Sequence, residues 1–425
     1  MPVFDSGLIE NRTTPRTTNV TIRVSNSGRT PAVVSIQLYR LDTATTGFNN
    51  RIYYSVNLFS LNPQNLSNDT YTLENVYADF DVFGVRVVTS GIGENNVAIT
   101  LTGKNAQNEV IFTRTEGEFT RIEELLFAYA SSFIDNTVNV YDIGTNTLVS
   151  TLSVGDAPAS IAIGKSGRRA YVANSGSDSV SVIDTSTNTL IGSPIPVGDT
   201  PISIAITPDT TRVYVTNQSA DTVSVINTST NTVIGPPIPV GTTPFGIAIT
   251  PDGSKAYVAL QRDNAVAVIS TATNTVTATI PVGANPNIVA ITPNGNKAYV
   301  TNATDETVSV IDTTTDSVIG LPIPVGIKPT GIVIIPDGTK AYVANQDSNN
   351  LTVINVLNDT VMVRSIPVGE VPFLIAATPD SSKIYVSIAN QAVIRIIDTV
   401  SNSVVGTLGS GTFPSGIQIT PILLF

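Results

Sequence analysis

The side chains that could do chemistry in this sequence are carboxylates, hydroxyls and tyrosines, because none of its 425 residues is histidine or cysteine. The lack of histidine removes the commonest general base and the commonest ligand of transition metals. The lack of cysteine excludes disulfides and thiolate metal sites. A serine or threonine nucleophile would need a lysine or carboxylate to activate it, and no Gly-x-Ser-x-Gly, Walker A or Gly-x-Gly-x-x-Gly motif stands between a strand and a helix.

The regularly spaced carboxylates are interpreted as turn residues rather than as a ring of metal ligands. They share fixed positions of a repeat, and at the first position Asn or Ser stands in other copies, as expected of side chains that cap turns. A calcium loop needs several oxygens within one segment, and no Asp-x-Asp-x-Asp-Gly occurs. The sequence therefore predicts no metal, no cofactor and no catalytic residue. The two sets of acids are Asp142, Asp184, Asp312 and Asp398, and Asp209, Asp252, Asp337 and Asp380.

One tyrosine recurs at intervals of 42 or 43 residues, at Tyr129, Tyr171, Tyr214, Tyr257, Tyr299, Tyr342 and Tyr385. Each tyrosine opens a short run such as Tyr214-Val215-Thr216-Asn217, and later in each unit a glycine is followed by proline three residues on. One tyrosine per unit at a fixed phase predicts packing between units. The alternative is a ring of tyrosines that stacks on carbohydrate.

Each unit contains four short alternating runs separated by turns, which in the third unit are residues 202–207, 213–217, 222–227 and 232–240. Four antiparallel strands in an all-β period of about 43 residues are typical of a propeller blade. A single blade cannot bury both of its faces, whereas a ring of blades can. The sequence therefore predicts an all-β, seven-bladed β-propeller over residues 123–425.

The first and last units predict how the ring closes. Residues 125–155 supply three strands without an innermost strand, and residues 413–420 match the innermost strand of the other units. The C-terminal strand is therefore expected to complete the first blade, which leaves no open sheet edge.

The repeats resemble the YVTN-type β-propeller family, on the Tyr-Val-Thr-Asn at 214–217 and 299–302 and the variants at 129–132, 171–174, 257–260, 342–345 and 385–388. The resemblance implies the propeller fold and a place among surface-layer, cell-envelope and related proteins, some of which are enzymes with extra catalytic loops. All seven units here are uniform in length, which leaves no room for such a loop.

The residues before the propeller predict a separate all-β domain. Residues 19–122 contain about seven strand-like runs, which favour an immunoglobulin-like or jelly-roll β-sandwich. Residues 1–18 are interpreted as an extended arm whose Val3, Phe4, Leu8 and Ile9 could add a strand to the next subunit and form fibres or layers. The alternative is that the arm folds back on its own sandwich.

Charge and hydropathy limit the classes of partner that the protein is expected to bind. The net charge of −11 comes without clustered Lys and Arg, which disfavours nucleic acid. No apolar run is long enough to span a bilayer, and no secretory signal is visible.

The positions that depart from the repeat on one propeller face are candidate partner-binding residues: Arg262, Asp263, Lys328, Glu370 and Phe413, with Ile327, Val371 and Thr412 beside them. They favour a non-enzymatic structural or interaction protein of a microbial cell or spore surface that binds a protein or a surface glycan. The alternatives are a propeller hydrolase of the lactonase kind and an intracellular scaffold.

Overall fold

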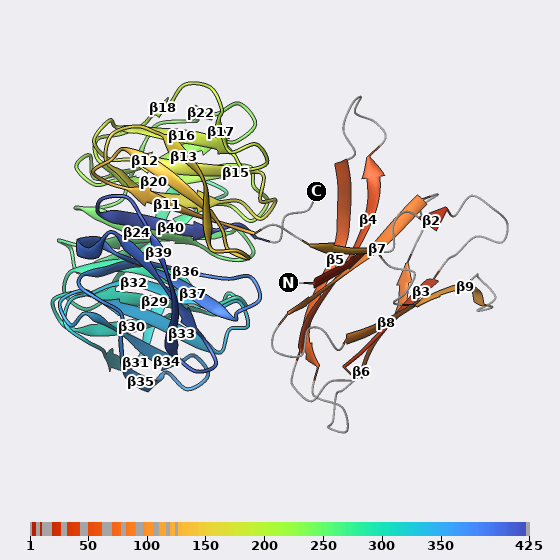
Figure 1. Cartoon of the computed structure of the whole chain (residues 1–425). Coiled ribbons are helices and arrows are strands. Elements are labelled where there is room, and N and C mark those ends of the chain that lie inside the picture. Colours follow the sequence, from red (N-terminus) through yellow and green to blue (C-terminus); the bar gives the residue numbers. More distant parts are fainter. Residues whose placement is uncertain are drawn as a thin grey trace. The chain divides into compact units, whose positions relative to one another are not determined.

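The structure, a computed structural model, describes residues 126–421 in full and, within residues 1–125, the backbone of ten strands (Figure 1). The chain divides into two compact units, Met1–Glu124 with Leu424–Phe425, and Leu125–Leu423. Each unit is considered by itself.

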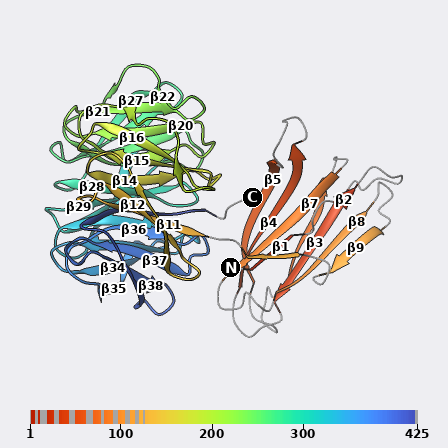
Figure 2. The same ribbon diagram turned by 45° about the horizontal axis from the view of Figure 1, so that its top comes forward.

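The second unit is a seven-bladed β-propeller, which confirms the predicted fold (Figures 1 and 2). Each blade is an antiparallel sheet in which the first strand is innermost and the fourth is outermost. Successive innermost strands contact one another around the ring.

The strands of blades 1 to 3 follow from inside outward. Blade 1 consists of β40 (Pro414–Ile419), β11 (Phe127–Ser132), β12 (Thr137–Asp142) and β13 (Thr147–Ser153). Blade 2 consists of β14 (Pro158–Ile163), β15 (Arg169–Asn174), β16 (Ser179–Asp184) and an outer strand in two pieces, β17 (Thr189–Leu190) and β18 (Ile195–Pro196). Blade 3 consists of β19 (Pro201–Ile206), β20 (Arg212–Asn217), β21 (Thr222–Asn227) and the pieces β22 (Thr232–Val233) and β23 (Ile238–Pro239).

The remaining blades have the same order. Blade 4 consists of β24 (Pro244–Ile249), β25 (Lys255–Leu260), β26 (Ala265–Ser270) and β27 (Thr275–Pro281). Blade 5 consists of β28 (Pro286–Ile291), β29 (Lys297–Asn302), β30 (Thr307–Asp312) and β31 (Ser317–Pro324). Blade 6 consists of β32 (Pro329–Ile334), β33 (Lys340–Asn345), β34 (Asn350–Asn355) and β35 (Thr360–Pro367). Blade 7 consists of β36 (Pro372–Ala377), β37 (Lys383–Ile388), β38 (Val393–Asp398) and β39 (Ser403–Gly409), with a 3-10 turn at Ala389–Gln391.

The repeated tyrosines lie between the blades. All seven are among the largest fully buried side chains. Tyr214 donates its hydroxyl to Asn274 Oδ1 of the next blade at 2.6 Å, and Tyr342 does the same to Asn402 at 2.6 Å. The packing interpretation is therefore confirmed, and buried rings are not available to stack on carbohydrate.

The last two residues of the Tyr-Val-Thr-Asn motif hold the loops around them. Asn217 donates from Nδ2 to Thr222 Oγ1 at 3.1 Å and to Ser224 Oγ at 2.9 Å, which fixes the turn after β20. Thr216 donates to the carbonyl of Phe245 in the next blade at 2.7 Å. All four residues of the motif therefore have structural roles. The tyrosine packs between blades, the valine is buried in the core, and the threonine and asparagine form the hydrogen bonds described above.

The C-terminal strand closes the ring as predicted. β40 pairs with β11, with Tyr129 opposite Gln418. Side chains add to this seam, because Ser131 and Ser415 hydroxyls lie 2.9 Å apart and Phe127 N donates to Thr420 Oγ1 at 2.9 Å. The start of β11 and the end of β40 therefore lie at the same end of blade 1.

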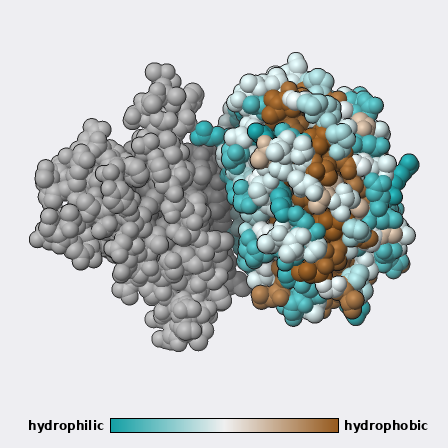
Figure 3. All heavy atoms as spheres, turned by 180° about the vertical axis from the view of Figure 1, so that it is seen from behind, coloured by the Kyte–Doolittle hydropathy of each residue, from teal (hydrophilic) through white to brown (hydrophobic). Residues whose placement is uncertain are grey.

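The outer strands carry much of the exposed apolar surface, and Figure 3 shows apolar side chains in a band across one side of the propeller. Such strands risk pairing with another sheet edge. In blades 2, 3 and 5 a glycine with positive φ (Gly192, Gly235 and Gly320) and nearby prolines interrupt the pairing.

The first unit contains two sheets. One has the order β10-β1-β7-β4-β5 with β2 beside β7, and the other has the order β6-β3-β8-β9. The strands are β1 (Pro2–Asp5), β2 (Ile9–Glu10), β3 (Asn19–Asn26), β4 (Ala32–Asp42), β5 (Asn50–Leu61), β6 (Thr70–Tyr77), β7 (Val82–Ser90), β8 (Val97–Lys104), β9 (Val110–Thr115) and β10 (Thr120–Glu123).

The residues of the expected arm bear on the assembly hypothesis. The backbone of Val3 and Phe4 pairs with β7 and β10, and that of Ile9 pairs with β7, which corresponds to the alternative in which the arm folds back. Leu8 lies outside the described residues. The β-sandwich topology, the domain boundaries and the assembly role remain predictions.

Candidate binding face

Two sets of loops form one face of the propeller, which we call the crossing face. The crossings that lead from one blade to the next are residues 154–157, 197–200, 240–243, 282–285, 325–328, 368–371 and 410–413. The loops between second and third strands are residues 133–136, 175–178, 218–221, 261–264, 303–306, 346–349 and 389–392. The start of β11 and the end of β40 lie at the opposite face of the propeller.

Each crossing ends in a residue with left-handed backbone immediately before a proline. The seven residues are Ala157, Thr200, Thr243, Asn285, Lys328, Val371 and Phe413, with φ between 50° and 60°. The carbonyl of each accepts a backbone hydrogen bond from the adjacent second-to-third-strand loop, as from Gln218 N to Thr200 at 2.9 Å. The blades therefore present seven different side chains on one repeated backbone.

Acidic residues of the loops cap the crossings. Asp178 accepts from Thr200 N at 2.8 Å, Asp221 from Thr243 N at 2.8 Å, and Asp305 from Ala284 N at 2.7 Å. Asp135 accepts from Thr412 N and from the Ser132 hydroxyl, and these bonds lower the pKa of Asp135. All four of these capping carboxylates are exposed.

The crossing face carries the net charge of the propeller. Its loops hold ten acidic residues and two basic ones, whereas the rest of residues 126–421 holds ten of each. All twelve of the charged side chains on this face are exposed. A surface of one sign raises the local concentration of oppositely charged partners and speeds their association.

The structure places the predicted partner-binding residues on this face in two groups. Lys328, Glu370 and Phe413 belong to three successive crossings, into blades 6, 7 and 1. Lys328 Nζ lies 3.8 Å from Asp347 Oδ1, and Glu370 is exposed. Arg262 and Asp263 belong to blade 4, where Asp263 caps Thr242 and Arg262 is exposed. The five residues therefore do not form one cluster.

Phe133 and Ile134 lie beside Phe413 and were not among the residues predicted from the sequence. The rings of Phe133 and Phe413 have centroids 6.0 Å apart at an interplanar angle of 59°, and Ile134 is 60% exposed. The signal was present, because other blades have Ala, Ser, Gln or another small or polar residue where blade 1 has Phe133-Ile134.

A chain of amides spans the other side of the crossing face. Gln218 Nε2 lies 3.4 Å from Gln261 Oε1, Gln261 Nε2 donates to Asn287 Oδ1 at 2.6 Å, and Asn287 Nδ2 donates to the carbonyl of Pro329 at 3.1 Å. These bonds tie blades 3 to 6 together, and we assign them a structural role.

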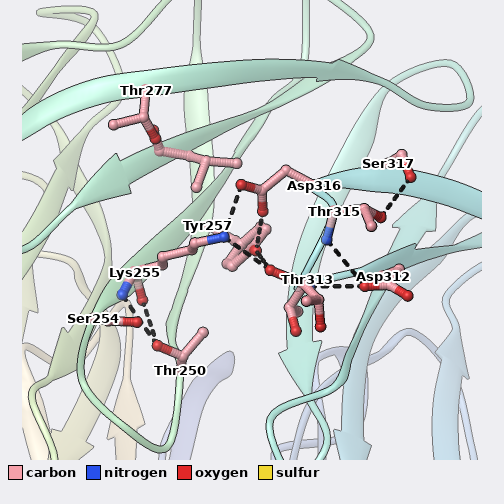
Figure 4. A network of polar contacts seen from close by, with 12 residues as sticks. Thr250, Ser254, Lys255, Tyr257, Thr277, Asp312, Thr313, Thr315, Asp316 and Ser317 are labelled. Atoms are coloured by element: carbon pink, nitrogen blue, oxygen red, sulfur yellow. Dashed lines mark hydrogen bonds and ion pairs between the residues drawn. The ribbon is translucent and has the colours of Figure 1, made fainter.

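The opposite face contains the other regularly spaced acids, and two lysines there form ion pairs with acids of the next blade. Lys255 Nζ lies 2.8 Å from Asp316 Oδ2 and donates to the carbonyl of Thr313 at 2.8 Å (Figure 4). The Tyr257 hydroxyl donates to the other oxygen of Asp316. Lys297, Tyr299 and Asp359 repeat the arrangement one blade on.

The acids of the Pro-Asp hairpins act within their own turns. Asp252 accepts from the Thr250 hydroxyl at 2.5 Å and from Ser254 N at 3.0 Å, and these bonds lower its pKa. Hollows of about 250 to 370 Å³ lie between neighbouring hairpins. Within residues 126–421, no group of three or more acidic side chains is placed to hold a metal ion.

The comparisons with known proteins support the fold. The family model described as "Lactonase, 7-bladed beta-propeller" matches residues 119–233, about a quarter of the chain. No curated protein matches the sequence. No helix of the described residues is long and apolar enough to cross a membrane.

Three solved structures share the propeller architecture. Hydrazine synthase of Kuenenia stuttgartiensis is 24% identical, with a TM-score of 0.56 over 62% of this chain and 90% of that one. A functionally unknown protein from Desulfotomaculum acetoxidans DSM 771 is 18% identical, with a TM-score of 0.61 over 69% and 98%. Apo AztD from Citrobacter koseri is 15% identical, with a TM-score of 0.54 over 70% and 98%. At these identities the likeness concerns the fold alone.

Proposed function

We propose that this protein is a non-enzymatic interaction protein of a microbial cell or spore surface, in which the propeller binds a partner through its crossing face. The observation that carries the proposal is the segregation of charge. The crossing face holds the whole net charge of the propeller on exposed side chains. On the opposite face, Lys255 and Lys297 pair with acids of the next blade, and acids such as Asp252 bond within their own turns.

The surface location rests on the resemblance to YVTN-type propellers. A low content of charged residues, 13%, and uniform blades are consistent with a display module. Residues 1–122 would serve as the module for attachment or for assembly into fibres or layers. The partner is a protein or a surface glycan, and neither nucleic acid nor membrane insertion has a part in this function.

Antibody labelling tests the proposed location. Antibodies raised against residues 126–421 are expected to label intact cells or spores of the producing organism in immunogold electron microscopy. A cytosolic protein labelled in parallel should appear only in sectioned cells. Label confined to the interior would overturn the surface function and favour the intracellular scaffold.

A hydrolase is the second candidate, because the matching family model is that of lactonase propellers. We propose that this chain lacks that activity, since it has no histidine and its repeated acids cap turns or pair with lysine. Purified full-length protein is expected to hydrolyse a panel of five- and six-membered lactones no faster than buffer, with or without added Ca²⁺, Zn²⁺ or Mn²⁺. Saturable turnover that disappears on heat denaturation would establish an enzyme instead.

A further inference from the structure

Large apolar side chains on the crossing face gather in three adjacent blades. Apart from the valine that opens six of the seven crossings, the loops contain five such residues: Phe133, Ile134, Ile327, Val371 and Phe413. All five belong to blades 6, 7 and 1, on both sides of the seam that β40 closes. We call these five residues the apolar arc.

The side chains of the apolar arc are accessible. Ile134 is 60% exposed and Ile327 is 49% exposed, while Phe133, Val371 and Phe413 are half-buried. Solvent-exposed apolar patches on otherwise polar surfaces mark interaction sites.

Two of these residues also conflict with their local backbone. Val371 has φ of 60° and Phe413 has φ of 58°, a region that a β-branched or bulky residue seldom occupies. Equivalent crossings have Ala157, Thr200 or Asn285, so the fold does not require a large apolar residue there. A strained apolar side chain that solvent partly reaches, at a position where the fold does not require it, is a sign of function.

Acidic residues surround the apolar arc. Asp135 adjoins Ile134 and Glu370 adjoins Val371 in sequence, and both acids are exposed. The basic residue next to Ile327 is Lys328, which pairs with Asp347. The arc therefore lies in a field of negative sign.

We propose that the apolar arc binds a basic protein segment in which Lys or Arg alternates with large apolar side chains. This proposal rests on the proposed function and names the class of partner. Charge complementarity selects the occupant, because polyanions and a second copy of the same negative face are repelled. Apolar contact distinguishes this partner from a purely polycationic one.

Peptide binding tests the class of partner. A short synthetic peptide of alternating Lys and Phe is expected to bind the full-length protein in fluorescence anisotropy. Alternating Glu and Phe should not bind, and alternating Lys and Ser should bind at least severalfold more weakly. Raising the ionic strength from about 0.01 M to about 0.15 M should weaken the binding of the peptide of Lys and Phe, since the Debye length falls from about 30 Å to about 8 Å.

Substitutions locate the site. Ile134→Ser with Val371→Ser is expected to weaken binding about tenfold, and Glu370→Lys severalfold. The matched control is Leu321→Ser with Leu357→Ser, which removes side chains 88% and 83% exposed on an outer strand and on the opposite face. Thermal melting should show that both double variants remain folded. If Ile134 proves essential for folding, Glu370→Lys against Asp199→Lys on blade 3 provides the same comparison.

Several results would overturn the proposal. An equal loss of peptide binding in the variant with Leu321→Ser and Leu357→Ser, or equal binding of all three peptides, would show that the apolar arc is not the binding site. Binding of neutral or acidic glycans in place of the basic peptide would refute the class of partner while leaving the surface interaction function intact. Failure of the surface labelling would instead refute the proposed function.

Discussion

Above about pH 10 the propeller is expected to lose stability steeply, because its seven repeated tyrosines stay protonated only while they are buried. Burial is the main cause that raises the pKa of each of them, and neighbouring carboxylates add to it at Tyr257 and Tyr299. A raised pKa in the folded state contributes stability below the unfolded pKa of about 10 and loses it as the pH rises further.

The number of tyrosines sets the size of the effect. Each tyrosine that remains protonated in the folded state lowers the free energy of unfolding by about 1.4 kcal/mol for each pH unit above its unfolded pKa. The rise in pKa is large at Tyr129, Tyr257, Tyr299, Tyr342 and Tyr385. These five together would cost roughly 7 kcal/mol per pH unit, which is comparable with the entire stability of a typical domain, about 5–15 kcal/mol. Unfolding is therefore expected within roughly two pH units of 10.

Tyrosinate absorbance and circular dichroism, followed together, measure this. The ionisation of the buried tyrosines should coincide with the loss of the β signal. Tyr342→Phe should reduce the steepness of the pH dependence, although it removes the bond to Asn402. Tyr385→Phe is a useful companion, because the Tyr385 hydroxyl is buried without a hydrogen-bond partner among the described residues. Ionisation of all thirteen tyrosines of the chain near pH 10 without unfolding would contradict the expected loss of stability.

Deletion of residues 414–425 is expected to abolish the stable monomeric propeller. The deletion removes β40, which pairs with β11 and contacts the innermost strands β14 and β36 on either side. Ile417 and Ile419 are both 4% exposed, and burial of each contributes about 1.5–3 kcal/mol. Each lost strand hydrogen bond adds about 1 kcal/mol. The sum approaches the net stability of a domain.

Thermal melting and size-exclusion chromatography report the outcome. The truncated chain should aggregate or melt far below the full chain, since β11 becomes an open apolar edge. Deletion of residues 422–425 alone is the matched control, because β40 ends at Ile419, and its melting temperature should not change. A truncation at residue 413 that melts like the full chain would contradict closure by β-pairing.

The sequence by itself determined the propeller, its blade number and its closure. Alternation within strands and the Tyr, Gly and Pro spacing are local signals, and seven copies of each make the pattern unambiguous. The roles of acidic turn residues such as Asp252 were also predictable, since an Asp bonds to its own turn whatever the rest of the chain does.

The tertiary structure alone decided which residues meet. Phe133 and Phe413 stand at opposite ends of the propeller sequence and become neighbours only because the ring closes. The hydroxyl of Tyr214 finds its acceptor, Asn274, sixty residues away for the same reason. The residues of the apolar arc and the charged residues of the crossing face come from loops of different blades. Repeat periodicity predicts each loop, but only packing of blade against blade places the departures from the repeat side by side.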